Sequence, residues 1–218
     1  MPDPTDRRRS SRRGTALLLL AAPLAALGAD EGDAWARLQR WLAGTRDLEA
    51  RFSQTLVSGA LGPGPVESGR LYLERPGRMR WDYERPERKV ALVIGERTRF
   101  YVAADRQLYE GTLDATEAAL VELLSSGRSL DAQYEARPAE PSGAGQVALR
   151  LVPRTPSSLG ELTVFTRPPD HALRAVELQD GAGNTIRYEF EVVRRNHGLD
   201  PRRFDFRPPP GTEIVAQP

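Results

Sequence analysis

Residues 69–86 read GRLYLERPGRMRWDYERP, and this stretch decides the fold that we expect for the chain. It divides into two short strands, residues 70–74 and 78–83, with Arg-Pro-Gly at residues 75–77 between them. Proline presets a backbone φ that suits the first corner of a turn, and glycine can adopt a positive φ at the next corner. The stretch therefore predicts two antiparallel strands joined by a tight reversal of the chain.

The second of these strands has one apolar face and one polar face. Met79, Trp81 and Tyr83 share a side, because successive side chains of a strand point to opposite faces. These three residues are large and adaptable or amphipathic, whereas Val, Ile and Leu usually fill a small closed core. The apolar face therefore either packs under a helix or lines a cavity, and its composition leaves both interpretations open.

The N-terminus has the composition of a secretory signal peptide. An apolar run over residues 16–27 follows a basic region, and small residues stand at Gly28 and Ala29. The run is short for a transmembrane helix, which needs about 20 apolar residues. We therefore predict that residues 1–29 are a cleaved export signal, which uses the general secretory route rather than the twin-arginine route. The basic residues are Arg7, Arg8, Arg9, Arg12 and Arg13.

Removal of the leader makes the remaining chain almost neutral. The leader holds five arginines and two aspartates, so its loss changes the formal net charge from +1 to −2. A general electrostatic attraction to nucleic acid is therefore not expected. The chain contains no cysteine, so its fold does not depend on disulfides and it offers no cysteine for a lipid anchor. Residues 30–218 suit one globular domain.

Two segments of the remaining chain have the pattern of helices. The first starts at Asp30 or Asp33, either of which can cap it, runs to about Ala43 and ends before Gly44. The second covers residues 114–124, starts with the capping-box pattern Asp114-x-x-Glu117, and is apolar over most of its surface. The first helix carries apolar residues at three- and four-residue spacing, namely Trp35, Leu38, Trp41 and Leu42.

Most of the remaining segments alternate with the period of strands. Gly- and Pro-rich segments at residues 58–65 and 138–145 are expected to be loops. Ten or eleven antiparallel strands result, and an amphipathic sheet of that size must curl and have its apolar face covered, for which the two helices are available. Besides the two opening strands, the predicted strands are residues 48–57, 89–94, 98–103, 107–109, 147–151, 162–164, 176–178, 186–192 and, at an edge, 213–215.

Four motifs, in their order and spacing after a signal peptide, resemble the periplasmic outer-membrane lipoprotein carrier family LolA. The resemblance covers nearly the whole chain beyond the leader. It implies a mainly β, α+β fold, in which a strongly curved antiparallel sheet forms an incomplete β-barrel, is covered by a helical lid and encloses an apolar cavity. The motifs are Phe52-Ser-Gln54, residues 69–76 continuing to Trp81, Tyr101 with Asp105-Arg-Gln107, and Phe204-Asp-Phe206 closed by Pro209-Pro-Gly211.

The resemblance also implies a function. Proteins of this family shield the acyl chains of lipid-modified proteins in the periplasm, which they receive from an inner-membrane ABC-type transporter and pass to an outer-membrane acceptor. A monomer without cofactor is implied. Two alternatives remain open, because carriers of this fold occur in several lipid pathways: a carrier of free lipid or glycolipid, and a lipid-sensing regulator of envelope stress.

Site residues follow from the resemblance in two groups. Arg75, directly before the turn proline, matches a family arginine that holds the lid shut by donating to backbone carbonyls of the covering helix. Sequence physics alone favours a solvated arginine at a strand end, and the resemblance brings the latch role level with that interpretation. The second group, which would line the acyl-chain cavity and would otherwise be ordinary core, contains Phe52, Met79, Trp81, Tyr83, Leu120, Leu123 and Leu124.

Two features depart from the family pattern and leave the ligand open. Met79 stands where the family often has a bulky aromatic residue, two positions before the tryptophan. The helix over residues 114–124 is rich in alanine and leucine and does not follow a recognisable lid sequence.

Catalysis, metal binding and nucleic-acid recognition find little support. The chain has two histidines, His171 and His197, both in predicted turns, and no metal-ligand or nucleophile pattern. We therefore predict a protein that is not an enzyme and has no metal site. The basic residues near the opening strands either form a solvated sheet face or dock on a transporter or on acidic head groups. They are Arg70, Arg78, Arg80, Arg85, Arg88 and Lys89.

Overall fold

The computed structural model describes residues 29–113, 115–125, 129–155, 161–180 and 183–216. The predicted leader, the capping residue Asp114 and the glycine at residue 127 that was expected to follow the second helix lie outside these residues. In the described part of the chain, neither helix is long and apolar enough to cross a membrane.

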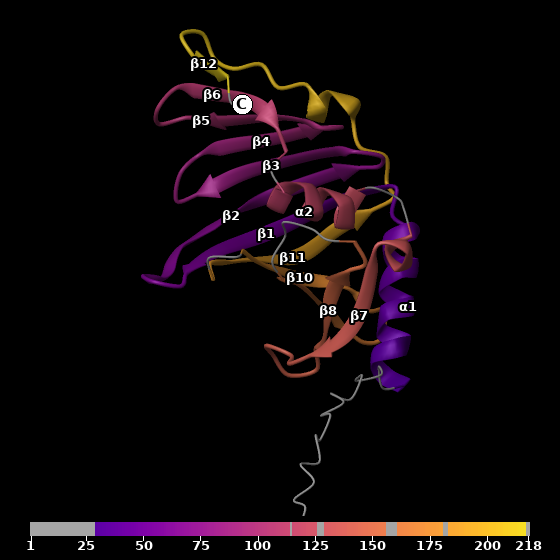
Figure 1. Cartoon of the computed structure of the whole chain (residues 1–218). Coiled ribbons are helices and arrows are strands. Elements are labelled where there is room, and N and C mark those ends of the chain that lie inside the picture. The colour runs from indigo at the N-terminus through magenta and orange to yellow at the C-terminus, as the bar shows by residue number, and fades with distance from the viewer. Residues whose placement is uncertain (1–28, 114, 126–128, 156–160, 181–182, 217–218) are drawn as a thin grey trace, which may run out of the picture.

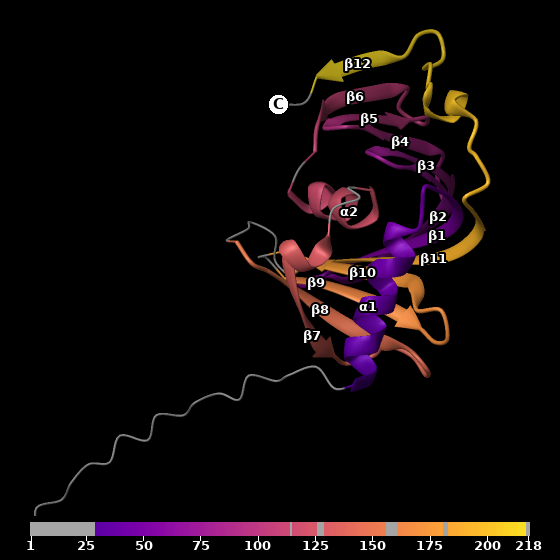
Figure 2. The same ribbon diagram turned by 90° about the vertical axis from the view of Figure 1, so that its right-hand side faces the viewer.

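The described residues form one curved sheet of twelve strands (Figure 1). The order across the sheet is β12-β6-β5-β4-β3-β2-β1-β11-β10-β9-β8-β7. Figures 1 and 2 place the edge strands β12 and β7 at opposite ends, so the sheet stays open and the predicted incomplete barrel is confirmed. The strands are β1 (Asp47–Ser58), β2 (Gly62–Glu74), β3 (Arg78–Arg85), β4 (Lys89–Ile94), β5 (Arg97–Val102), β6 (Gln107–Thr112), β7 (Tyr134–Ala139), β8 (Val147–Pro153), β9 (Glu161–Arg167), β10 (Ala172–Gln179), β11 (Thr185–Arg195) and β12 (Glu213–Ala216).

The opening stretch forms the strand pair β2–β3, as predicted. Gly77 at the reversal has a φ of 69°, which glycine adopts without strain. In the register of the pair, Leu73 lies opposite Met79 and Leu71 opposite Trp81. These four side chains are almost completely buried, so the apolar face of β3 points to the covered side of the sheet.

Two helices cover the concave face of the sheet, as the sequence predicted (Figure 2). Helix α1 (Ala29–Ala43) packs against β8 and β10, and helix α2 (Ala115–Ser125) packs against β2 and β3. Leu38 of α1 and Leu123 of α2 are fully buried in one hydrophobic cluster with Trp81 of the sheet. Two short 3₁₀ helices, η1 (Leu130–Ala132) and η2 (Pro201–Phe204), were not predicted.

The prediction of a loop over residues 58–65 was wrong. Strand β1 continues to Ser58 and β2 already begins at Gly62, so that Pro63 and Pro65 lie inside a strand. The prolines are tolerated because β3 pairs with β2 only from Ser68 onward, which leaves the earlier part of β2 with a free edge. The two strands thus form a long hairpin whose tip projects at the left of Figure 1.

The strand count and the all-antiparallel arrangement also need correction. Strand β7 was missed because it contains Pro138, which an edge strand accommodates. Strand β12 was predicted as an edge strand, but it pairs with β6 in parallel. The reason is that residues 196–212, which we call the C-terminal strap, cross the convex face before the chain reaches that edge (Figure 2). Leu199 and Phe204 of the strap are buried there against Tyr72 and Leu92.

Candidate functional site

A cavity of about 300 Å³ lies between α2 and the concave face of the sheet. Met79, Trp81 and Tyr83 of β3 form part of its wall, and Leu120 of α2 lies over them. Of the predicted cavity residues, Phe52, Leu123 and Leu124 are instead buried in the adjoining core. Their contact with an acyl chain stays a prediction.

Seven further residues of the wall were not predicted from the sequence. Three of them, Leu178, Ile186 and Tyr188, come from β10 and β11, far along the chain from the opening stretch. The alternation of β11 was visible in the sequence, but its place beside β1 was not, because the register joins segments far apart in the sequence. The other four are Gln54, Ala91, Val93 and Val121.

Aromatic side chains give the wall a defined shape. The ring of Phe52 packs edge-on against both Trp81 and Tyr83, with ring centroids 4.9 and 5.0 Å away. Trp81 also lies 5.2 Å from the ring of Tyr188. Such ring pairs stabilise by roughly 0.5–1.5 kcal/mol beyond the burial of their area. Met79 beside them has an unbranched side chain that can repack around a ligand of irregular shape.

One polar pair lies on this wall. The Tyr83 hydroxyl donates a hydrogen bond of 2.7 Å to Oε1 of Gln54. Since both groups have a protein partner, the wall accepts an apolar ligand without leaving this hydroxyl unsatisfied. The described residues that line the cavity carry no formal charge, and this hydrogen bond is made within the protein, so the cavity suits hydrophobic groups.

Arg75 joins the β2–β3 turn to the end of α2. Its Nε and Nη2 donate to the Leu124 carbonyl oxygen at 3.0 and 2.7 Å. The N–H of Gly77 donates to the carbonyl of Ser125 at 3.4 Å. The last carbonyls of a helix have no partner within the helix, and a cation is favoured there by the helix dipole. The turn therefore holds the C-terminal end of the helix that covers the cavity, and we call these contacts the latch.

Burial affects the charge of this arginine. Desolvation lowers the pKa of the Arg75 guanidinium from its ordinary value, but an arginine remains protonated at neutral pH. Both hydrogen bonds to Leu124 are therefore assisted by a full positive charge in a half-buried position.

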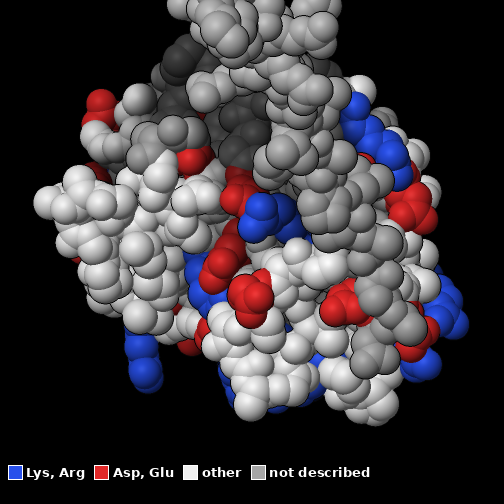
Figure 3. Space-filling view, turned by 60° about the horizontal axis from the view of Figure 1, so that its bottom comes forward, with Lys and Arg blue, Asp and Glu red and all other residues white. Residues whose placement is uncertain are grey.

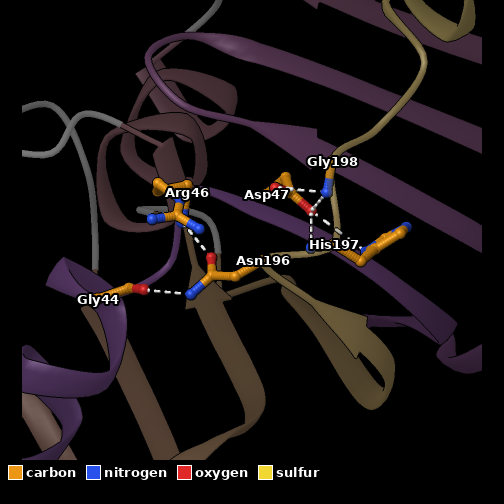
Figure 4. A network of polar contacts seen from close by, with 6 residues as sticks. All are labelled: Gly44, Arg46, Asp47, Asn196, His197 and Gly198. Atoms are coloured by element: carbon orange, nitrogen blue, oxygen red, sulfur yellow. Dashed lines mark hydrogen bonds and ion pairs between the residues drawn. The ribbon is translucent and has the colours of Figure 1, made fainter.

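The base of the latch is fixed by a polar junction, shown in part in Figure 4. The N–H of Arg75 donates to the Arg46 carbonyl at 2.8 Å, and the N–H of Arg46 donates to Oδ1 of Asn196 at 2.7 Å. The Nδ2 group of Asn196 donates to the Gly44 carbonyl at 2.7 Å. The junction joins the end of α1, the β2–β3 turn and the start of the C-terminal strap.

Asp47 completes this junction. Its carboxylate is buried and accepts the N–H of His197 at 2.9 Å and the N–H of Gly198 at 3.2 Å (Figure 4). Nδ1 of His197 lies 3.2 Å from the same carboxylate. One side chain of β1 thus sets the bend at which the strap leaves β11.

We expect Asp47→Ala to lower the free energy of unfolding by about 2 kcal/mol, because two N–H groups of the strap bend lose their acceptor. Urea denaturation measures this loss. Asp205→Ala is the matched control, because Asp205 lies in the same strap but is exposed, with its one ion pair at 3.8 Å, and should change stability by less than about 0.5 kcal/mol. Equal stability of the two variants would contradict a structural role for the junction.

A second hollow, of about 650 Å³, lies at the convex face between the strap and strands β3–β5. Charged residues line much of it, including Glu84, Arg88 and Lys89. This composition suits a polar ligand, so the cavity under α2 is the better site for an apolar one. Acidic and basic side chains are also interspersed on the face shown in Figure 3.

The two histidines have separate structural contacts. His171 is buried, with Nδ1 3.2 Å from Oγ1 of Thr166, and His197 belongs to the junction. Within the described ranges, no three His, Cys, Asp or Glu side chains gather as a metal site would require.

An open curved sheet, a helix across its concave face and an apolar cavity between them define a carrier of hydrophobic ligands. The family described as Outer membrane lipoprotein carrier protein LolA matches residues 43–207, and the chain belongs to this family. The resemblance noted in the sequence is thereby confirmed.

Two relatives and one solved structure show how far the similarity extends. An outer-membrane lipoprotein carrier protein of Methylibium petroleiphilum is 31% identical, over 94% of this chain and 100% of the relative. One of Chromobacterium violaceum is 29% identical, over 92% of this chain and 96% of the relative. The crystal structure of an uncharacterized conserved protein from Thermus thermophilus shares the fold, with a TM-score of 0.50 and 13% identity over 86% of this chain and 99% of that chain.

Proposed function

We propose that the protein is a periplasmic carrier for the acyl chains of lipoproteins. It receives them from an ABC-type transporter of the inner membrane and delivers them to an acceptor at the outer membrane. The observation that carries the proposal is the aromatic-lined apolar cavity beneath a helix that Arg75 holds. The full-length similarity to proteins named as lipoprotein carriers supports it.

The size of the cavity implies that α2 moves when cargo binds. Ligand sites in proteins commonly enclose roughly 300–1,000 Å³, so this cavity lies at the small end of the range. A lipoprotein with several acyl chains needs more room. The described arrangement is therefore the closed form, and cargo enters when α2 leaves the sheet.

The free energy gained by burying an acyl chain is larger than the free energy lost when the latch contacts break. A hydrogen bond to a charged group contributes roughly 1.5–3 kcal/mol to stability. Burial of an acyl chain contributes about 0.8 kcal/mol per methylene group, which gives on the order of 10 kcal/mol for a palmitoyl chain. One acyl chain can therefore displace the Arg75 contacts, and their return favours closure after release.

The proposed function also requires that the protein is exported to the periplasm. Residues 1–29 serve as the cleaved signal peptide, and residues 30–218 act as a monomeric carrier domain without a cofactor. The basic n-region and short apolar run of the leader support this assignment.

The cargo is tested by mass spectrometry of protein purified from its native periplasm. We expect acylated peptides or proteins to co-purify, because the bound acyl chains would have to enter water if they left the protein without an acceptor. Free phospholipid or glycolipid as the only bound species would contradict the lipoprotein assignment and favour a carrier of free lipid. The mass of the purified chain also gives the cleavage site.

A further inference from the structure

The β1–β2 hairpin contains a long stretch without charge. From Phe52 to Val66 no residue is Asp, Glu, Lys or Arg, although 28% of the whole chain is charged. This stretch includes the tip of the hairpin, residues 59–61, where β1 ends and β2 begins. The tip lies at the left of Figure 1. Figure 3 is turned about the horizontal axis only, so the same side stays at the left, and the lobe there is mostly white, the colour of uncharged residues.

The hairpin also exposes large apolar side chains. Leu61 at the tip is 90% exposed, and Leu56 of β1 and Val66 of β2, each five residues from it along the chain, are 47% and 58% exposed. Scattered apolar residues are normal on a protein surface, but a group on one projecting, uncharged element marks a contact site. We call residues 56–66 the hairpin tip region.

This region continues the wall of the cavity. Leu56 of β1 lies directly opposite Ile186 of β11, and residues paired in this way lie on the same face of a sheet. Ile186 is part of the cavity wall. An apolar path therefore runs along the concave face from the cavity to the hairpin tip region.

We propose that the hairpin tip region docks on the surface of a phospholipid bilayer, with Leu61 inserted among the acyl chains. The cavity then opens directly toward the lipid. The inference goes beyond the carrier role, because it holds whatever cargo the cavity takes.

The chemistry of the region favours lipid over a protein partner that adds a strand. Pro63 and Pro65 lie where β2 has no neighbour on the β3 side, and proline on a free edge prevents pairing with another chain. Arg85 and Arg88 are exposed at the same end of the sheet, and within the described residues neither has an ion pair. Glu87 between them offsets part of their charge. An apolar tip beside basic side chains is the composition of proteins that bind bilayers with anionic lipid.

The test uses the chain from Asp30 onward, because the apolar leader would itself bind lipid. The protein has no cysteine, so Leu61→Cys and Ile94→Cys each give one site for a nitrobenzoxadiazole label. Ile94 is the control, since it is exposed apolar surface at the opposite end of β4, beside the latch. The vesicles contain phosphatidylethanolamine and phosphatidylglycerol, without lipoprotein.

We expect vesicles to shift the emission of the label at position 61 to shorter wavelength and to leave the label at position 94 unchanged. In vesicle flotation, Leu61→Ser should lower the partition constant of the unlabelled protein roughly tenfold, and Ile94→Ser should change it by less than about twofold. Both serine variants replace exposed residues, so circular dichroism should show the native fold.

Three results would overturn the inference. The first is an unshifted label at position 61, and the second is an equal shift at positions 61 and 94, which would indicate nonspecific adsorption. The third is a shift at position 61 only when an acceptor protein is added, which would assign the hairpin tip region to protein docking. None of these results depends on the cargo, so the lipoprotein proposal is tested separately by its co-purified ligand.

Discussion

Gly69→Ala should destabilise the protein by about 3 kcal/mol or more, and lower its melting temperature by roughly 10 °C. Gly69 is buried in β2, and a Cβ atom there would lie 1.9 Å from the Asp82 carbonyl oxygen of β3. The obstacle is backbone, so no rotamer change can relieve it. Strands β2 and β3 must therefore move apart at Gly69. In the sheet, Gly69 lies between Phe52 of β1 and Tyr83 of β3, whose rings are in contact, so the separation also disturbs this aromatic pair.

Gly32→Ala provides a control with the same chemical change. Gly32 lies in α1, and apart from its chain neighbours and the backbone of its own helix, no atom would lie within 4 Å of a Cβ atom there. Alanine favours a helix over glycine by roughly 0.5–1 kcal/mol, so this variant should be slightly more stable than the wild type. Differential scanning calorimetry of both proteins makes the comparison. If the Gly69→Ala protein had the same melting temperature as the wild type, the two strands would separate at little cost in free energy, which would contradict the close approach of β2 and β3 at Gly69.

Arg75→Leu should tighten the binding of an apolar fluorescent probe about tenfold, and slow release to an acceptor accordingly. The closed form excludes a large ligand, so the measured affinity depends on how often α2 opens. Removal of the two hydrogen bonds to Leu124 raises the population of the open form. Hydrogen exchange of the α2 amides should increase in the same variant, because the end of the helix loses its anchor.

Two further variants distinguish the effect of the Arg75 hydrogen bonds from the effect of its positive charge. Arg75→Lys keeps the positive charge but cannot direct two fixed donors at one carbonyl, so it should behave between the wild type and Arg75→Leu. Arg78→Leu removes an exposed arginine that directly follows the turn and pairs with Glu74 at 3.0 Å, and it should leave probe binding unchanged. If Arg75→Leu and Arg78→Leu bind and release the probe alike, the lid is not held by Arg75.

The sequence predicts well those elements whose pattern is local. The turn at Gly77, the β4–β5 hairpin and both helices follow from neighbouring residues, and the structure contains them all. Strand β7 was missed because Pro138 argues against a strand unless its place at the edge is known. Likewise, β12 could not be assigned to a parallel pair before the path of the strap was known.

The residues of the cavity wall were likewise predictable only where a local pattern identifies them. Its near wall, Met79, Trp81 and Tyr83, follows from the alternation of a single strand. Its far wall includes Ile186 and Tyr188, which reach the site because β11 pairs with β1. The hydrogen bond between Arg46 and Asn196 joins residues 150 positions apart, and no local sequence pattern predicts such a pair.

The position of β1 within the sheet has a consequence for folding. Its neighbours are β2, the next strand along the chain, and β11, whose Glu191 lies 140 residues after its ion-pair partner Arg51. Contacts of such long sequence separation form slowly, because a large loop must close before they contribute. During synthesis one side of β1 therefore stays unpaired until nearly the whole chain is available. This unpaired edge is prone to aggregation, and a chaperone that binds it would protect the chain until β11 is made.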